Sequence, residues 1–281
     1  MANQKKKWLF IYILYGSIVF FLSIYVLFPN SVVKDYITAR VAAKYPVIHL
    51  SIEKLSFIPI LGFSLNKLSI RSQKKPGAAL DIKKLTTRLS LFQLFKNKTL
   101  FKIKAEACQG IATGVLRYDH FLSTHGPETA EVDFEDIRID KCPFLHDLFG
   151  RPVSGKLKGT LAFKGNIAQW TTGTGKIRFA LQNGTYPLLE PFAGMDKMSF
   201  KKIEGSLELR NGILKITRLE LTGQGLLCSL NGNVLLVGAD IGQSRLDLTG
   251  SITLPGTGNS GNRKLPLAVT GIFANAKATV L

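Results

Sequence analysis

Residues 205–222 read GSLELRNGILKITRLELT and alternate apolar with polar residues on both sides of a central Asn-Gly pair. Leu207 and Leu209 precede the pair, and Leu214 and Ile216 follow it. A period of two is typical of a β-strand with one buried and one solvated face. Asn-Gly supplies the positive φ angles that a two-residue hairpin turn requires. The segment therefore predicts an antiparallel hairpin of two half-buried strands.

The apolar phase of this segment slips by one residue at Arg218-Leu219. A second slip lies in residues 131–140 (EVDFEDIRID), between Phe134 and Ile137. An extra residue in a strand returns the apolar side chains that follow it to the buried face. Each slip therefore predicts a β-bulge.

The same alternation recurs from Val47 to the C-terminus, so residues 47–281 are predicted to form a mainly β domain built on an antiparallel sheet. Further hairpin turns are predicted at Asn183-Gly184 and Asn231-Gly232. Residues 89–96 and 142–149 break the pattern, and each predicts a single helical turn lying across the sheet. Residues 255–264 predict a loop before one last strand, residues 265–281. The clearest runs of alternating apolar residues are Phe101, Ile103, Ala105 and Ala107; Leu157, Leu161 and Phe163; Ile177, Phe179 and Leu181; Leu246 and Leu248; and Ile252 and Leu254.

Residues 8–28 (WLFIYILYGSIVFFLSIYVLF) carry no charge and are preceded by Lys5, Lys6 and Lys7. A helix of this length spans about 31 Å, close to the thickness of a hydrocarbon core. The lysines favour a cytoplasmic N-terminus. A cleaved signal peptide is the alternative, but residues 27–30 offer no small-x-small cleavage site. We expect a cytoplasmic tail at residues 1–7, a single transmembrane helix at 8–28, and the β domain across the membrane.

Residues 29–46 are predicted to hold a juxtamembrane helix, because Val33, Tyr36, Ile37 and Val41 follow helical spacing and Pro46 ends the pattern. The chain has 37 Lys and Arg against 19 Asp and Glu, a net charge of +18. Such a chain attracts polyanions. We expect no nucleic-acid partner, because the aromatic residues alternate with lysines instead of forming a stacking surface, and because the domain lies outside the cytoplasm.

The sequence predicts no catalytic, cofactor or metal site, and we expect the protein not to be an enzyme. The four histidines, His49, His120, His125 and His146, lack metal-binding spacing and are interpreted as surface residues. The carboxylates Glu131, Asp133 and Glu135 share one face of a strand and are interpreted as solvated. Residues 172–176 (TGTGK) lack both the first glycine and the Ser/Thr of a phosphate-binding loop.

Three cysteines, Cys108, Cys142 and Cys228, are far apart in the chain. An oxidising compartment permits one disulfide and one free thiol, and the spacing does not say which two pair. We favour the interpretation that all three are small buried apolar residues.

Several stretches resemble known families. Phe28-Pro29, the helix after it and residues 57–70 (FIPILGFSLNKLSI) resemble the opening of type II secretion system protein N. Residues 155–165 (GKLKGTLAFKG), 173–181 (GTGKIRFAL) and 203–254 are similar to the later half of that family. Residues 265–276 (LPLAVTGIFANA) resemble the closing strand of the wider AsmA-like group, with Ala276 where that group often has proline.

The resemblance implies a long curved antiparallel sheet of the AsmA-like kind, with a few short helices. It also implies a bacterial inner-membrane protein with a periplasmic β domain that acts as a structural subunit of the type II secretion system. Platform or secretin subunits and inner-membrane lipids are the partners expected of it. The alternative is an AsmA-like lipid-binding or lipid-transfer protein, whose sheet shelters phospholipid acyl chains in an apolar groove. No catalytic residue or cofactor comes with either family.

Overall fold

The computed structural model describes residues 2–58, 62–73, 79–90, 99–119, 126–149, 152–192, 195–223, 226–237, 241–254, 263–273 and 275–280. Within these ranges it has one 14-stranded sheet, in which the strands follow sequence order and each is antiparallel to the next. The prediction of a mainly β, antiparallel fold with a few short helices is confirmed. The strands are β1 Ile48–Ile58, β2 Gly62–Ser72, β3 Ala79–Leu89, β4 Thr99–Ala107, β5 Gly110–Tyr118, β6 Thr129–Arg138, β7 Lys156–Lys164, β8 Thr174–Phe192, β9 Met195–Arg210, β10 Ile213–Gly223, β11 Leu227–Leu235, β12 Arg245–Leu254, β13 Arg263–Ile272 and β14 Asn275–Val280.

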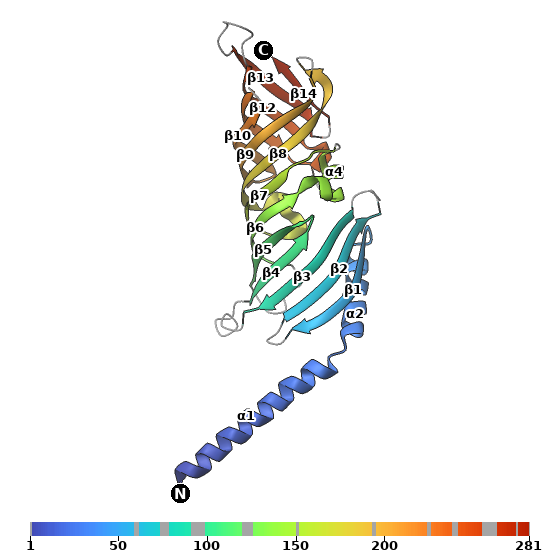
Figure 1. Ribbon diagram of the computed structural model, residues 1–281, viewed down its shortest axis with the longest axis vertical. Helices are drawn as coiled ribbons and strands as arrows, with labels where there is room; N and C mark the ends of the chain where they lie inside the picture. Colours follow the sequence, from blue (N-terminus) through green and yellow to red (C-terminus); the bar gives the residue numbers. More distant parts are fainter. Residues whose placement is uncertain are drawn as a thin grey trace.

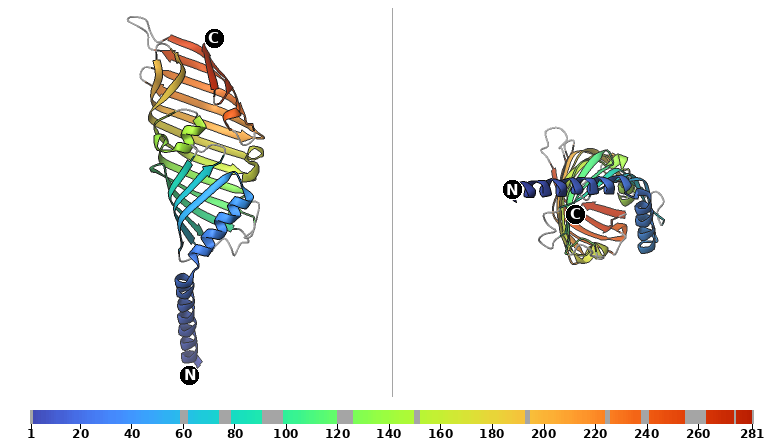
Figure 2. Two further views of the ribbon diagram at one scale, coloured as in Figure 1. Left: turned by 90° about the vertical axis from the view of Figure 1, so that its right-hand side faces the viewer. Right: turned by 90° about the horizontal axis from the view of Figure 1, so that it is seen from below.

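The sheet is curved along its length, and successive strands stack along the long axis of the molecule (Figure 1). Strands in a sheet lie about 4.8 Å apart, so fourteen of them extend over roughly 60 Å. Two helices, α2 (Asn30–Lys44) and α4 (Pro143–Phe149), lie on the same open side of the curve (Figure 2). Short 3-10 helices occur at η1 Ile139–Lys141, η2 Ile167–Thr172 and η3 Ile241–Gln243.

The N-terminal helix α1, Ala2–Leu27, leads away from the sheet (Figure 1). Among the described residues, no helix taken singly has the length and apolar character needed to cross a membrane. The helical stretches Ile11–Leu27 and Asn30–Lys44 reach that length and composition only as a pair, and a bend of 62° separates them.

Phe28 lies outside α1, although the sequence predicted a helix over residues 8–28. The cause is Pro29, because a proline ring disfavours helical φ and ψ at the residue before it. The freed Phe28 ring lies 4.8 Å from the Phe57 ring and 5.9 Å from the Phe63 ring, measured between centroids. The Phe57 backbone N–H also donates a hydrogen bond of 3.2 Å to Oδ1 of Asn30. The start of α2 is thus attached to the β1–β2 hairpin.

The helix predicted within residues 29–46 is α2, which ends at Lys44, two residues before Pro46. Val33 and Ile37 on α2 pack against the buried side chains of β1, β2 and β3. The helical turn predicted at residues 142–149 is α4. The one predicted at residues 89–96 lies outside the described residues after Ser90. Residues 255–262 of the loop predicted over residues 255–264 also lie outside them, whereas Arg263 and Lys264 belong to β13, so the prediction of a loop at these two residues is wrong.

Both predicted bulges are confirmed. The register of β10 shifts against β11 between Ile216 and Leu219, and that of β6 shifts against β7 between Phe134 and Ile137. The bulge in β6 includes Asp136, which has a φ of 52°. The register of β3 also shifts against β4, between Ile82 and Lys84, and this shift was not predicted.

Only one of the three predicted Asn-Gly turns forms. Asn211 and Gly212, with φ angles of 49° and 77°, connect β9 to β10. The Asn183-Gly184 pair lies inside β8, and the prediction of a turn there is wrong. A Cβ on Gly184 would lie 2.0 Å from the Ser154 carbonyl oxygen, so this glycine permits a close backbone approach within a strand.

The prediction of a turn at Asn231-Gly232 is wrong for the same reason, because both residues lie inside β11. Gly232 has a φ of 144°, and a Cβ there would lie 2.2 Å from the Asp247 carbonyl oxygen of β12. The prediction of one last strand over residues 265–281 is also wrong. The chain turns after Ile272 and returns as β14, whose Asn275 pairs with Ile272.

A disulfide joins Cys108 to Cys142, and Cys228 is free. The interpretation of all three cysteines as unpaired is therefore wrong for two of them. Cys108 and Gln109, with φ angles of 51° and 61°, form the turn between β4 and β5. The Arg138 backbone N–H at the end of β6 donates a 2.9 Å hydrogen bond to the Cys108 carbonyl oxygen. The disulfide thus attaches the start of α4 to the β4–β5 hairpin.

We expect a Cys108→Ser/Cys142→Ser double variant to lose roughly 3–4 kcal/mol of unfolding free energy, since the bond closes a loop between residues 34 positions apart. The measurement is urea denaturation of the full chain in detergent, followed by circular dichroism with and without reductant. A Cys228→Ser variant is the control, because it removes a thiol without removing a cross-link. An unchanged transition in the double variant would contradict the structural role of the disulfide.

Candidate functional site

The apolar residues of the sheet form continuous rows that run across its strands. The register pairs each member of one such row directly with the next, with one residue from every strand. Directly opposed side chains in a sheet are close enough to touch. The sheet therefore has one uninterrupted apolar face, whose central row is Leu55, Leu65, Leu85, Ala105, Ala112, Phe134, Gly159, Phe179, Gly205, Leu219, Leu230, Gly250, Leu267 and Val280.

The other face of the sheet is polar. A row adjacent to the central apolar row consists of Ser56, Ser64, Thr86, Lys104, Thr113, Asp133, Thr160, Arg178, Ser206 and Arg218. Glu131 of the predicted acidic run is also on this face, where it forms an ion pair with Arg117 at 2.5 Å. The hydrogen bond and the charge of Arg117 lower the pKa of the Glu131 carboxyl. Most charged side chains thus lie on one face of the sheet and most apolar side chains on the other.

Two helical segments cover parts of the apolar face. Helix α2 covers β1 to β3, where Ile52, Leu55 and Leu68 are 3–6% exposed. Further along the sheet, Ile139 of η1 and Leu145 of α4 pack over apolar residues of β7, β8 and β9. The most buried large side chain of this second cluster is Ile139, which is 1% exposed.

Between these covered parts, the apolar face of β4 to β8 retains contact with solvent. Every large apolar side chain in three neighbouring rows there is only half-buried. We call this set the apolar window. It consists of Phe101, Ile103, Leu116, Val132, Phe134, Leu161, Phe163, Ile177 and Phe179.

Glycines shape the floor of the apolar window. A Cβ on Gly205 would lie 2.2 Å from the Phe179 ring, and one on Gly159 would lie 2.9 Å from the Phe134 ring. The aromatic rings thus lie over glycines on neighbouring strands, an arrangement that gives the sheet a smooth apolar surface. At the edge of the window, the Tyr118 ring meets the Phe101 ring edge-on at 5.5 Å, and burial raises the pKa of the Tyr118 phenol.

The nine side chains of the apolar window are all apolar. The described residues contain no group of three or more His, Cys, Asp or Glu that could hold a metal ion. His49 is exposed and His146 lies on α4, whereas His120 and His125 lie outside the described residues. Sequence reasoning identified the apolar strands but not the apolar window, because the covering of β1 to β3 and β7 to β9 depends on contacts with helices distant in the chain.

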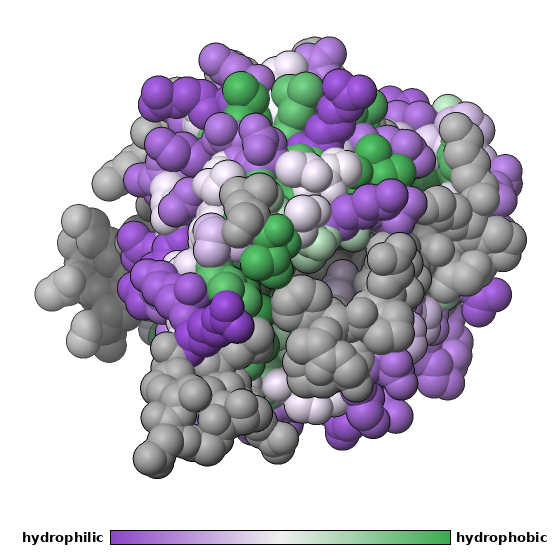
Figure 3. Space-filling model, turned by 90° about the horizontal axis from the view of Figure 1, so that it is seen from above, coloured by the Kyte–Doolittle hydropathy of each residue, from purple (hydrophilic) through white to green (hydrophobic). Residues whose placement is uncertain are grey.

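Hydrophobic residues also reach the surface at the end of the molecule formed by the last strands, between hydrophilic ones (Figure 3). Val280 of β14 belongs to the central apolar row and is 37% exposed, so the apolar face is accessible at this end as well as at the apolar window. Leu227 and Leu235, at 51% and 50% exposed, alternate with the apolar-face residues of β11 and lie on the other face of the sheet.

No protein-family model, curated protein or solved structure matches the chain.

Cys228 provides a natural probe of the apolar face, because it pairs in register with Leu221 and Ile252. Burial raises the pKa of its thiol, so at a given pH the folded chain holds less of the reactive thiolate than an unfolded one. We expect the rate of alkylation of Cys228 by iodoacetamide to rise with pH around a midpoint above the ordinary thiol value. The urea-unfolded chain is the control, and an identical pH profile in both states would contradict the burial of Cys228.

Proposed function

We propose that this chain is a membrane-anchored protein of the bacterial envelope that binds phospholipid acyl chains on the apolar window of its sheet. The observation that carries the proposal is that all nine window side chains are only half-buried, although they lie in rows of the sheet that are almost entirely apolar. A closed core would bury these residues. Burial of apolar surface stabilises a complex by about 25 cal/mol per Å², so the window favours a long apolar ligand.

The shape of the apolar face supports an extended ligand. Its rows cross the strands and follow the long axis, so a chain lying along a row stays in apolar contact from strand to strand. Small-molecule sites fix orientation with a few polar groups. The nine side chains of the apolar window include no polar group, which suits an acyl chain that needs only apolar contact.

Helix α1 supplies the membrane anchor in this proposal. Most of its described side chains are apolar, and they are exposed on all sides, among them Ile11, Leu14, Ile18 and Leu22, which are 51–60% exposed. A helix that is apolar all round needs an apolar environment. The sheet, at roughly 60 Å, suits lipid binding or a short transfer step better than a continuous bridge across the envelope.

We expect the full chain, purified in mild detergent, to retain phospholipid in native mass spectrometry. A Leu161→Asp variant should lower lipid occupancy at least about tenfold, because it places a carboxylate in the apolar window. Thr160→Asp on the polar face of the same strand is the matched control and should retain the lipid. Thermal unfolding of both variants verifies that they fold, and Leu161→Ala tests the window without a charge.

Lipid-free wild-type chain, or equal occupancy in Leu161→Asp and Thr160→Asp, would contradict the proposal.

A second candidate is the structural subunit of the type II secretion system that the resemblance implies. The observation in its favour is the edge of the sheet, since β14 pairs within the described residues with β13 alone. An unpaired strand edge can add a strand from another protein. Purification of the full chain from native membranes should then recover platform or secretin subunits, and recovery of none would count against this role.

A further inference from the structure

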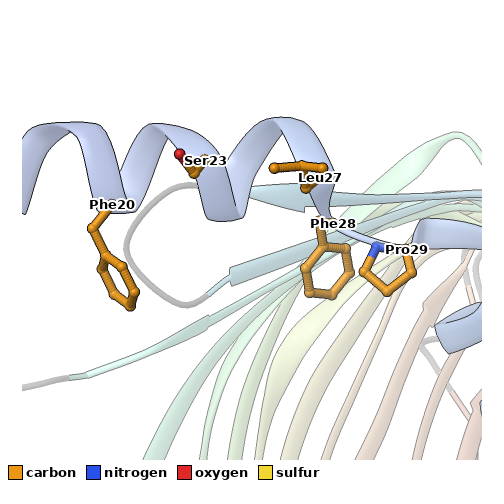
Figure 4. A pocket seen from close by; sticks show the side chains of 5 residues that line it. All are labelled: Phe20, Ser23, Leu27, Phe28 and Pro29. Carbon is orange, nitrogen blue, oxygen red and sulfur yellow. The ribbon is translucent and has the colours of Figure 1, made fainter.

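A shallow, open hollow of about 360 Å³ lies along the C-terminal end of α1, and four of its five lining residues are apolar: Phe20, Leu27, Phe28 and Pro29, with Ser23 as the fifth (Figure 4). Phe20 and Leu27 are large apolar residues that are 61% and 77% exposed. The rings of Phe20 and Phe28 lie on the same side of the chain in Figure 4.

Phe28 connects this hollow to the apolar face of the sheet. It lines the hollow and also stacks on Phe57, at 4.8 Å between centroids. Phe57 pairs in register with Phe63, whose ring lies 5.7 Å from it. The apolar surface is thus continuous from α1 through three aromatic rings to the first strands.

From Phe63 the same row continues into the apolar window. Its members pair in register as Phe63, Thr87, Ile103, Gly114, Val132, Leu161 and Ile177. Thr87 is the one polar residue among them, and Ile103, Val132, Leu161 and Ile177 belong to the window. Apart from Thr87, a row of apolar residues therefore connects the residues at the hollow with the window.

We propose that this hollow is a second lipid site, which receives the end of a phospholipid acyl chain from the bilayer and passes it to the apolar window. The inference rests on the proposed function, because it assigns the route by which the window is filled. The occupant is an acyl chain since the hollow adjoins the exposed apolar surface of α1 on one side and the apolar face of the sheet on the other. Ser23 is the one lining side chain that can hydrogen-bond, so a headgroup finds almost no polar partner there.

Leu27 and Val26 provide a matched pair for the test. Both are highly exposed at the end of α1, at 77% and 72%, but Leu27 lines the hollow and Val26 does not. Substitution of either by aspartate changes the charge of this helix end equally. The difference between the two variants therefore reports the hollow alone.

The experiment follows the filling of the apolar window in the full chain. The reporter chain carries Phe134→Trp together with Trp8→Phe and Trp170→Phe, so that its fluorescence comes from the window. The chain is reconstituted into vesicles of phosphatidylethanolamine and phosphatidylglycerol in equal amounts, and vesicles whose phospholipids carry brominated acyl chains are then fused with them. The rate of tryptophan quenching measures loading. Thermal unfolding verifies that the reporter chain is folded.

We expect Leu27→Asp to slow loading at least about tenfold, because a carboxylate in the hollow repels an acyl chain, and Val26→Asp to load like the reporter chain. In detergent micelles containing the brominated lipid, both variants should reach the same quenching, since no transfer from a bilayer is needed there. Equal loading rates of the two variants, fast or slow, would overturn the route through the hollow while leaving lipid binding in place. An absence of quenching in every chain, in vesicles and in micelles, would instead overturn the proposed function.

Discussion

The structure depends on the register between neighbouring strands, which keeps apolar side chains opposite apolar side chains across the whole sheet. A shift of one residue in any strand would move its apolar residues to the solvated face. The bulge after Phe134 and the one after Ile216 prevent such an error by taking up one extra residue each. Because each strand pairs with its sequence neighbours, these local corrections are enough to maintain a single apolar face over fourteen strands.

An antiparallel sheet of this kind must cover its apolar face, and here the covering is incomplete. Helix α2 covers the first strands, and the segment from Ile139 to Leu145 covers part of the middle. The disulfide between Cys108 and Cys142 holds the second cover in place, because it ties the base of α4 to the β4–β5 turn. The apolar window between the two covers is what makes a binding role the best physical account of the sheet.

The end of α1 at Pro29 also determines where Phe28 lies. Pro29 ends α1 and releases Phe28, which then joins Phe57 and Phe63 at the edge of the apolar face. One local constraint on the backbone thus places an aromatic side chain between a helix that is apolar on all sides and a sheet that is apolar on one. The proposed route of loading depends on this continuity, because it places the hollow at the end of α1 next to the apolar face that contains the window.

The sequence by itself determined the β class of the domain, the Asn211-Gly212 hairpin, both bulges and the helices around residues 29–46 and 142–149. These features follow from periodicity and local backbone preference, which a short stretch of chain contains in full. It did not determine that Asn183-Gly184 and Asn231-Gly232 lie inside strands, where each glycine allows the backbone of another segment to come close. Nor did it determine which cysteines pair or which part of the apolar face stays uncovered. Only the tertiary structure decided these, because each depends on which residues far apart in the chain come into contact.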